Sequence, residues 1–132
     1  MKDIVKSVTR HLCKYYDIKK IARAKHRGEL EDSNRYSYSL RWYDAIRTVI
    51  NYWSEFHPLY SKAVLSTFGF DPVVPWKHRK PVLQASMEFN ISTPQLYKYR
   101  QEFCADVFRI ACIRGLIHEE FPKHCENATR GG

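Results

Sequence analysis

The chain lacks a long apolar segment. No hydrophobic run approaches the roughly 20 residues that cross a bilayer, and the N-terminus lacks the apolar region of a secretion signal. The chain also has no Gly-rich phosphate loop, no dinucleotide-binding fingerprint, no internal repeat and no convincing pair of strands. These absences predict an all-α, cytoplasmic protein with no membrane partner and no cofactor.

Cysteine is scarce, and the four thiols are not arranged for chemistry. They are Cys13, Cys104, Cys112 and Cys125. In the cytosol we expect reduced thiols rather than disulfides. A metal site would have to join the last two cysteines to two histidines, at a spacing without the close pairs that zinc sites favour. Its members would be Cys112, His118, His124 and Cys125. No thiol has an activating neighbour and no two carboxylates have a forced geometry, so the sequence predicts neither a metal site nor an enzyme.

Positive charge, in contrast, is in excess. The 132 residues include 22 Lys and Arg against 14 Asp and Glu, a net charge of +8. Residues 1–30 hold nine basic against three acidic residues, and residues 76–100 hold five against one. Segments 31–75 and 101–132 are each −1. A polyanion would therefore meet two basic surfaces rather than a uniform field, although solvated faces also cluster charge without a partner.

Apolar spacing, together with start and stop residues, predicts five helices. They cover residues 2–27, 40–56, 59–68, 79/80–89 and 93–114. Ser39 is the expected cap of the second helix, Gly69 ends the third, and the proline-rich segment after it is a rigid connector. The chain divides into a basic amphipathic helix with a polar loop, a helical bundle and a tail. The three parts span 1–38, 39–117 and 118–132.

Two helices have a predicted buried stripe. In the second helix it is Leu40, Tyr43, Ile46 with Arg47, Ile50, and Trp53 with Ser54. In the last helix it is Leu96, Tyr99, Phe103, Val107 and Ile110 with Ala111. Aromatic residues are dense around the second helix, at Tyr36, Tyr38, Trp42, Tyr43, Tyr52 and Trp53. We favour core packing or a helix interface for them over stacking on single-stranded bases.

Residues 81–114 have the layout of a DNA-reading helix-turn-helix. The first helix needs a small residue where the second crosses it, and the turn needs a residue that tolerates left-handed backbone. An inward residue and a cap then begin the second helix. The residues in these roles are Ser86, Phe89, Asn90, Ile91, Ser92 and Leu96. Ser92 and Gln95 are spaced as a capping box, and Gly115 is a helix stop.

In a major groove, the exposed start of the last helix faces the bases. Gln pairs with adenine there, and Lys with guanine. The predicted base-reading residues are Thr93, Gln95, Tyr97, Lys98 and Gln101. Basic residues at the edge of the motif are better placed for phosphates. Those are Lys77, Arg79, Lys80 and Arg100.

Residues 40–116 resemble the ArpU/RinA group of phage transcription regulators, which are similar to region four of sigma factors. The matching segments are AIRTVINYW, KAVLSTF and KPVLQASMEFNIS followed by TPQLYKYRQEFCADVFRIA. The resemblance implies an activator of late phage or prophage genes that binds promoter DNA near the host RNA polymerase. It carries base reading onto Thr93, Pro94, Gln95, Tyr97, Lys98 and Gln101.

Two other classes stay open on the residues alone. One is a DNA-packaging subunit resembling the small terminase, which shares the helix-turn-helix. The other is a helical module whose basic faces meet an acidic protein. A homodimer is also expected, because a single motif of this kind buries little surface for specific DNA binding. The basic first helix would be either a second DNA contact or an arm for an oligomer partner.

Overall fold

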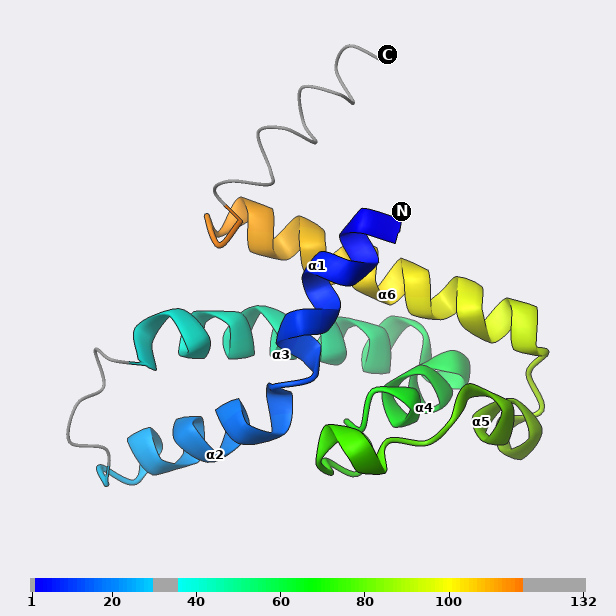
Figure 1. Ribbon diagram of the computed structural model, residues 1–132, viewed down its shortest axis with the longest axis horizontal. Helices are drawn as coiled ribbons and strands as arrows, with labels where there is room; N and C mark the ends of the chain where they lie inside the picture. Colours follow the sequence, from blue (N-terminus) through cyan, green and yellow to red (C-terminus); the bar gives the residue numbers. More distant parts are fainter. Residues whose placement is uncertain (1, 30–35, 118–132) are drawn as a thin grey trace, which may run out of the picture.

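The computed structural model describes residues 2–29 and 36–117 (Figure 1). Its elements are α1 (Lys2–Leu12), α2 (Tyr15–His26), α3 (Ser37–Phe56), α4 (Pro58–Thr67), the short 3-10 helix η2 (Trp76–His78), α5 (Val82–Phe89) and α6 (Thr93–Ile113). The predicted all-α class is confirmed. Over the described ranges, the only β pairing is an isolated bridge between Phe70 and Val73. No described helix has both the length and the apolar character to cross a membrane.

Helices α3 and α6 lie side by side in opposite directions, and α1 crosses them (Figure 1). Arg114, just after α6, donates to Asp44 and Thr48 near the start of α3. At the other end, Trp53 Nε1 donates to Asp106 of α6 over 2.8 Å. Helix α2 packs on α3, and α4 and α5 pack around the start of α6. The start of α6 therefore lies at one end of the molecule, supported by two short helices.

The single helix predicted for residues 2–27 is wrong, because the chain turns at Cys13 and Lys14 between α1 and α2. No Gly or Pro marks the break. Leu12 and Tyr15, on either side of it, are both almost fully buried. Helix α1 packs on α6 while α2 packs on α3. A straight helix could not meet both surfaces, so tertiary packing decides the turn.

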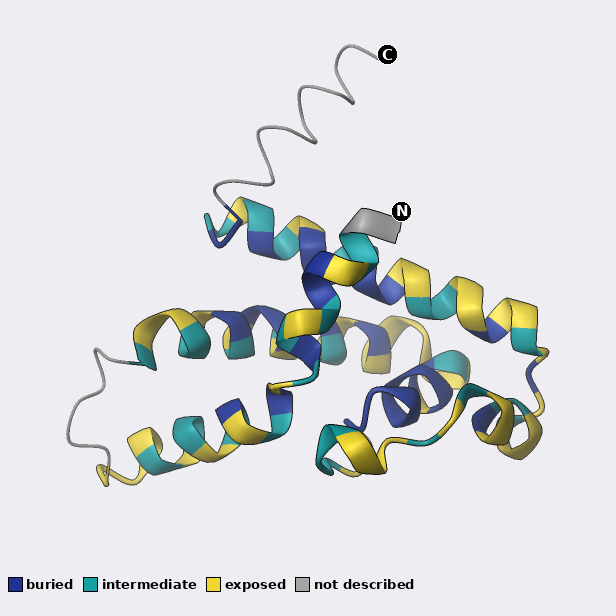
Figure 2. Ribbon diagram, viewed as in Figure 1, coloured by how far each residue is buried: buried dark blue, intermediate teal, exposed yellow. Residues whose placement is uncertain are grey.

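Every long helix has buried positions along its length (Figure 2), and aromatic side chains join the helices in the core. Tyr15 of α2 contacts Phe70, with 4.3 Å between ring centroids. Phe68, after α4, contacts both Phe70 and Phe103, at 5.9 and 5.5 Å. Trp53 of α3 packs edge-on against Phe103 at 5.7 Å. These contacts connect α2, α3, α4 and α6 in one apolar cluster, so the core-packing interpretation of the aromatic residues is correct for Trp53.

The buried face of α3 is displaced from the predicted stripe. Only Ile46 and Trp53 of that stripe are buried. Leu40, Tyr43 and Ile50 are half-buried. The buried residues of α3 are Trp42, Ala45, Ile46, Val49 and Trp53. The displacement follows from position, because α3 packs against α2, α4 and α6 and so buries more than one side.

Helix boundaries also differ in detail. Ser39 does not cap α3, which begins two residues earlier with Tyr36 at the cap position. Helix α5 begins at Val82, with Pro81 as its cap, rather than at residue 79 or 80. Gly69 and Gly115 end their helices as predicted, with φ of +76° and +71°. The predicted tail and most of the polar loop lie outside the described residues.

Candidate nucleic-acid interface

A three-residue turn joins α5 to α6 within the range predicted for it. Asn90 has φ 55° and ψ 46°, the left-handed conformation that Asn tolerates. Ile91 then points into the core and Ser92 stands at the cap. Ala85 of α5 is fully buried, which lets α5 and α6 approach closely.

Ser86 fixes the angle between the two helices. Its hydroxyl donates to the Ile91 carbonyl over 2.6 Å, and Thr93 Oγ1 donates to Ser86 Oγ over 3.2 Å. One small side chain of α5 thereby holds both the turn and the first residue of α6. A rigid support of this kind is what a helix needs if it is to place side chains against a ligand.

Half of the predicted capping box forms. Ser92 Oγ accepts from the backbone N–H of Gln95 over 3.3 Å. The Gln95 side chain, however, does not return to Ser92, because its amide donates to the Tyr99 hydroxyl over 2.7 Å. Tyr99 in turn stacks on Tyr60, with ring centroids 4.3 Å apart. Tyr99 thus belongs to the helix packing, and Gln95 is directed along α6.

The first two turns of α6 carry an exposed face. Its members follow a spacing of three and four residues, so they line one side of the helix. They are Pro94, Tyr97, Lys98 and Gln101. Leu96, between them in sequence, is fully buried and holds the helix on the core. The structure therefore leaves Tyr97, Lys98 and Gln101 of the predicted base-reading set open, while Thr93 is half-buried and engaged with Ser86.

Two of the predicted phosphate residues lie together beside this face. The Arg79 guanidinium lies 4.2 Å above the Trp76 ring, and that of Arg100 lies 4.7 Å above Phe68. Burial, and to a lesser degree the charge of Arg79, lowers the pKa of Arg100. The Phe68 and Trp76 rings are themselves stacked. No carboxylate of the described residues pairs with either arginine, so this aromatic shelf carries two unbalanced cations.

The other two predicted phosphate residues differ from each other. Lys77 is exposed in η2. Lys80 is already paired, because its Nζ lies 2.7 Å from Glu88 Oε2. Its charge is therefore balanced by a carboxylate of α5. The sequence predicted neither this ion pair nor the stacking of Arg79 on Trp76. Both involve residues of the connector before α5, and the sequence did not define the path of that connector.

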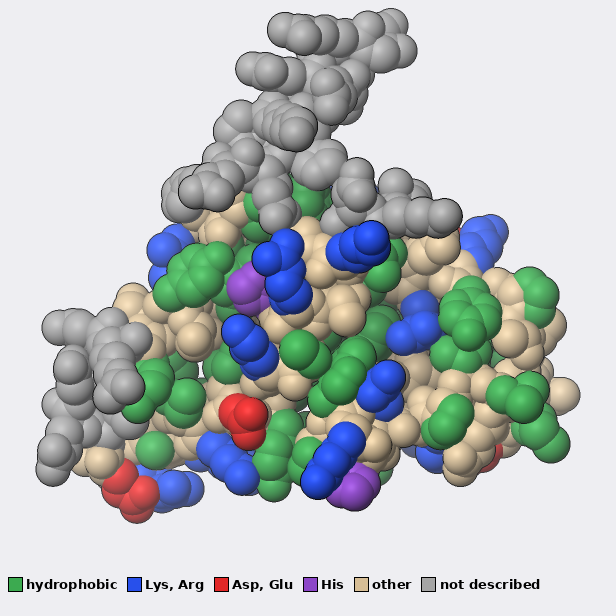
Figure 3. All heavy atoms as spheres, viewed as in Figure 1, with side chains coloured by type: hydrophobic (Ala, Val, Ile, Leu, Met, Phe, Trp, Pro, Cys, Tyr) green, Lys and Arg blue, Asp and Glu red, His purple; other side chains and the backbone are tan. Residues whose placement is uncertain are grey.

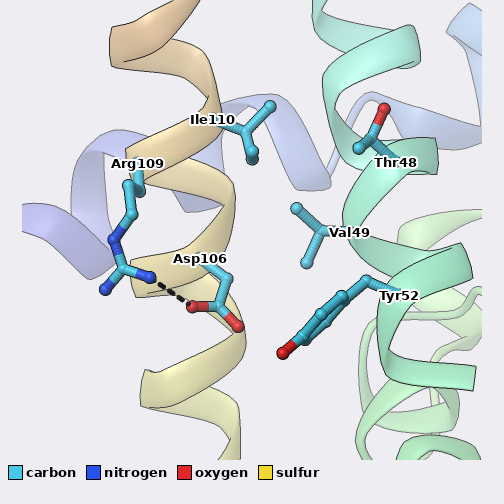
Figure 4. Close-up of a pocket in the computed structure, with 6 residues that line it drawn as sticks. All are labelled: Thr48, Val49, Tyr52, Asp106, Arg109 and Ile110. Carbon is cyan, nitrogen blue, oxygen red and sulfur yellow. Dashed lines mark hydrogen bonds and ion pairs between the residues drawn. The ribbon is translucent and has the colours of Figure 1, made fainter. Parts of the chain in front are cut away.

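A separate hollow of about 300 Å³ lies between α3 and α6 (Figure 4). Asp106 is its only acidic group, and both carboxylate oxygens have donors. Trp53 Nε1 donates to one over 2.8 Å, and Arg109 donates to the other over 3.2 Å. This carboxylate joins α3 to α6, and Arg109 of the same helix balances its charge.

The thiol of Cys104 is not reactive by position. Cys104 is buried in α6, and burial raises its pKa to about 12. A thiol that stays protonated is neither a nucleophile nor a metal ligand. Within residues 2–29 and 36–117, no three His, Cys, Asp or Glu side chains are grouped to hold a metal ion. His118, His124 and Cys125 of the metal candidate lie outside the described residues.

Comparisons of the chain with known protein families, with curated proteins and with solved structures found no match in any of the three.

Proposed function

We propose that the protein is a sequence-selective, double-stranded DNA-binding regulator that reads bases with the start of α6. The observation that carries the proposal is the exposed face of Tyr97, Lys98 and Gln101 beside the unpaired cations of Arg79 and Arg100. A groove-binding helix needs both parts, because base contacts select the sequence while phosphate contacts hold the helix in register.

The residue types suit this division of roles. Gln101 has the donor and acceptor that pair with adenine, and Lys98 donates to guanine. Tyr97 offers an apolar ring edge for a thymine methyl group. Arg79 stands on the rigid ring of Trp76, where its guanidinium meets a phosphate with little loss of side-chain freedom. Promoter binding near RNA polymerase, on a phage or prophage gene, is the regulatory role that the family resemblance favours.

Selection of bound duplexes from a random pool tests the proposal. We expect a recovered motif, whose symmetry would report a homodimer. Lys98→Ala and Gln101→Ala should relax single positions of that motif by about 1–3 kcal/mol each. Arg79→Gln should instead weaken binding to every duplex about equally, with Lys62→Gln, at an exposed position of α4, as the charge-matched control. Pools that return no motif, or equal effects from all three variants, would refute base reading by α6.

The packaging alternative predicts a different assembly from the same motif. Light scattering of the full chain separates the two, since a closed ring of many copies indicates packaging and a monomer or dimer indicates regulation. A module for acidic proteins predicts no duplex binding even at low salt. Phosphate contacts release counterions, so DNA affinity must fall steeply with salt if the proposal is correct.

A further inference from the structure

A second hollow, lined mainly by basic side chains, lies far from the start of α6. It measures about 510 Å³ and opens between α2 and α3. Its lining is Ala22, Arg23, His26, Arg27 and Tyr43. The end of α2 and the start of α6 lie at opposite ends of the longest axis (Figure 1). On the face in Figure 3, Lys and Arg side chains are spread over α1 and α2, while acidic side chains are sparse.

The cations around this hollow exceed the acids. Lys19 and Arg23 are four residues apart on the same side of α2, and Arg47 faces them from α3. Burial, followed by the charges of Arg23 and Arg47, lowers the pKa of Lys19. In the described part of the chain, no ion pair joins these three residues to a carboxylate. A bound anion would relieve their mutual repulsion.

The acids near the hollow do not balance Lys19, Arg23 and Arg47. Glu29 lies 3.0 Å from Arg27 Nε, which leaves the other cations of the hollow without a counter-charge. Asp44 of α3 is bound by Arg114 over 2.8 Å. Asp17 is exposed on a different side of α2 from Lys19 and Arg23.

The floor of the hollow is held by packed aromatic rings. Tyr43 stacks on Tyr15 with 5.4 Å between centroids. Tyr15 is only 2% exposed and interacts through its hydroxyl with Arg47 and Tyr43. Arg47 is exposed, but its interaction with the buried Tyr15 links it to the core. This arrangement differs from a set of freely solvated side chains, because the Tyr43 wall packs on a buried ring and one cation interacts with that ring's hydroxyl.

We propose that this α2–α3 hollow binds the phosphate backbone of DNA outside the segment read by α6. The inference rests on the proposed function, which supplies the nucleic acid. Its separation from α6 means that the two surfaces engage different stretches of one duplex. The basic N-terminal helices then act as a second, sequence-independent DNA contact that adds affinity without changing base preference.

The test compares two double variants of α2 that each remove two positive charges. Lys19→Gln with Arg23→Gln alters one cation that lines the hollow, Arg23, and its neighbour on α2, Lys19. Lys14→Gln with Lys25→Gln alters exposed positions outside the hollow. Binding to a duplex of roughly 30 base pairs is measured across salt concentrations. Each lost phosphate contact lowers the slope of log affinity against log salt by about 0.9. We expect a slope reduced by roughly 2 for the hollow pair, close to the wild-type slope for the control pair, and the same selected motif for both.

The outcomes are distinguishable. Equal slopes for the two pairs, with base selection intact, would overturn this inference and leave the proposed function standing. Wild-type chain that binds no duplex at low salt would overturn both. Polyglutamate binding that disappears in the hollow pair, while duplex affinity is unchanged, would assign the hollow to an acidic protein and also overturn it. Circular dichroism melts of both pairs confirm that each variant is folded.

Discussion

Removing the Glu88 carboxylate should strengthen DNA binding. In the folded chain Glu88 holds Lys80 Nζ at 2.7 Å, at the entrance to α5. Lys80 is therefore neutralised although it stands just before α5, the helix that packs on the proposed groove-binding helix. Glu88→Gln frees the ammonium group for a phosphate and removes a negative charge that would repel the DNA. A single substitution then increases DNA affinity, whereas nonspecific damage from a mutation usually decreases it.

The size of the gain follows from counterion release. One added phosphate contact steepens the salt dependence by about 0.9. Across one decade of salt, from 1 M to 0.1 M, the ratio of the variant's affinity to the wild-type affinity should therefore rise roughly eightfold. The cost to folding is small, because the pair is partly solvated. The Lys80 side chain is 27% exposed and that of Glu88 is 47% exposed. Partly exposed pairs contribute about 0–1 kcal/mol to the free energy of unfolding.

Fluorescence anisotropy with a labelled duplex measures the slope for each variant. Lys80→Gln combined with Glu88→Gln should abolish the gain, because no ammonium group is left to bind the phosphate. Glu55→Gln removes the same charge from an exposed position of α3 and serves as the control. The reasoning is refuted if Glu88→Gln leaves the slope unchanged. It is also refuted if the gain persists in the double variant, which would attribute it to the lost carboxylate alone.

Two further predictions concern stability. Ser92→Ala removes the acceptor of the Gln95 N–H and should lower the free energy of unfolding by about 1 kcal/mol, measured by urea denaturation; an unchanged midpoint would show that the cap does not support α6. Burial raises the pKa of Cys104 to about 12, so the folded chain keeps a proton that the unfolded chain loses above about pH 9. Stability should therefore fall as pH rises from 9 toward 12, by at most roughly 1.4 kcal/mol per pH unit from this thiol. Cys104→Ala should flatten the fall between pH 9 and 10, and a fall of equal slope in that variant would exclude the thiol as its source.

Local signals in the sequence identified the features that depend on neighbouring residues. The cap at Ser92, the left-handed Asn90 and the stop at Gly115 each follow from the backbone preference of one residue type. The all-α class and Leu96 as the inward residue of α6 follow from the spacing of apolar residues. The exposed positions 97, 98 and 101 follow in turn, because helical periodicity fixes the opposite face once the buried one is known.

Contacts that depend on the path of the chain between elements were decided only by the tertiary structure. The turn between α1 and α2 exists because the two helices pack on different partners, and no local residue specifies it. The pairing of Lys80 with Glu88, and the positions of Arg79 on Trp76 and Arg100 on Phe68, depend on the path of the connector before α5. Residue types thus established that the chain carries cations on helices. Packing determined which of them are neutralised and which remain available to an anion, since charges separated in sequence interact only after the core has brought them together.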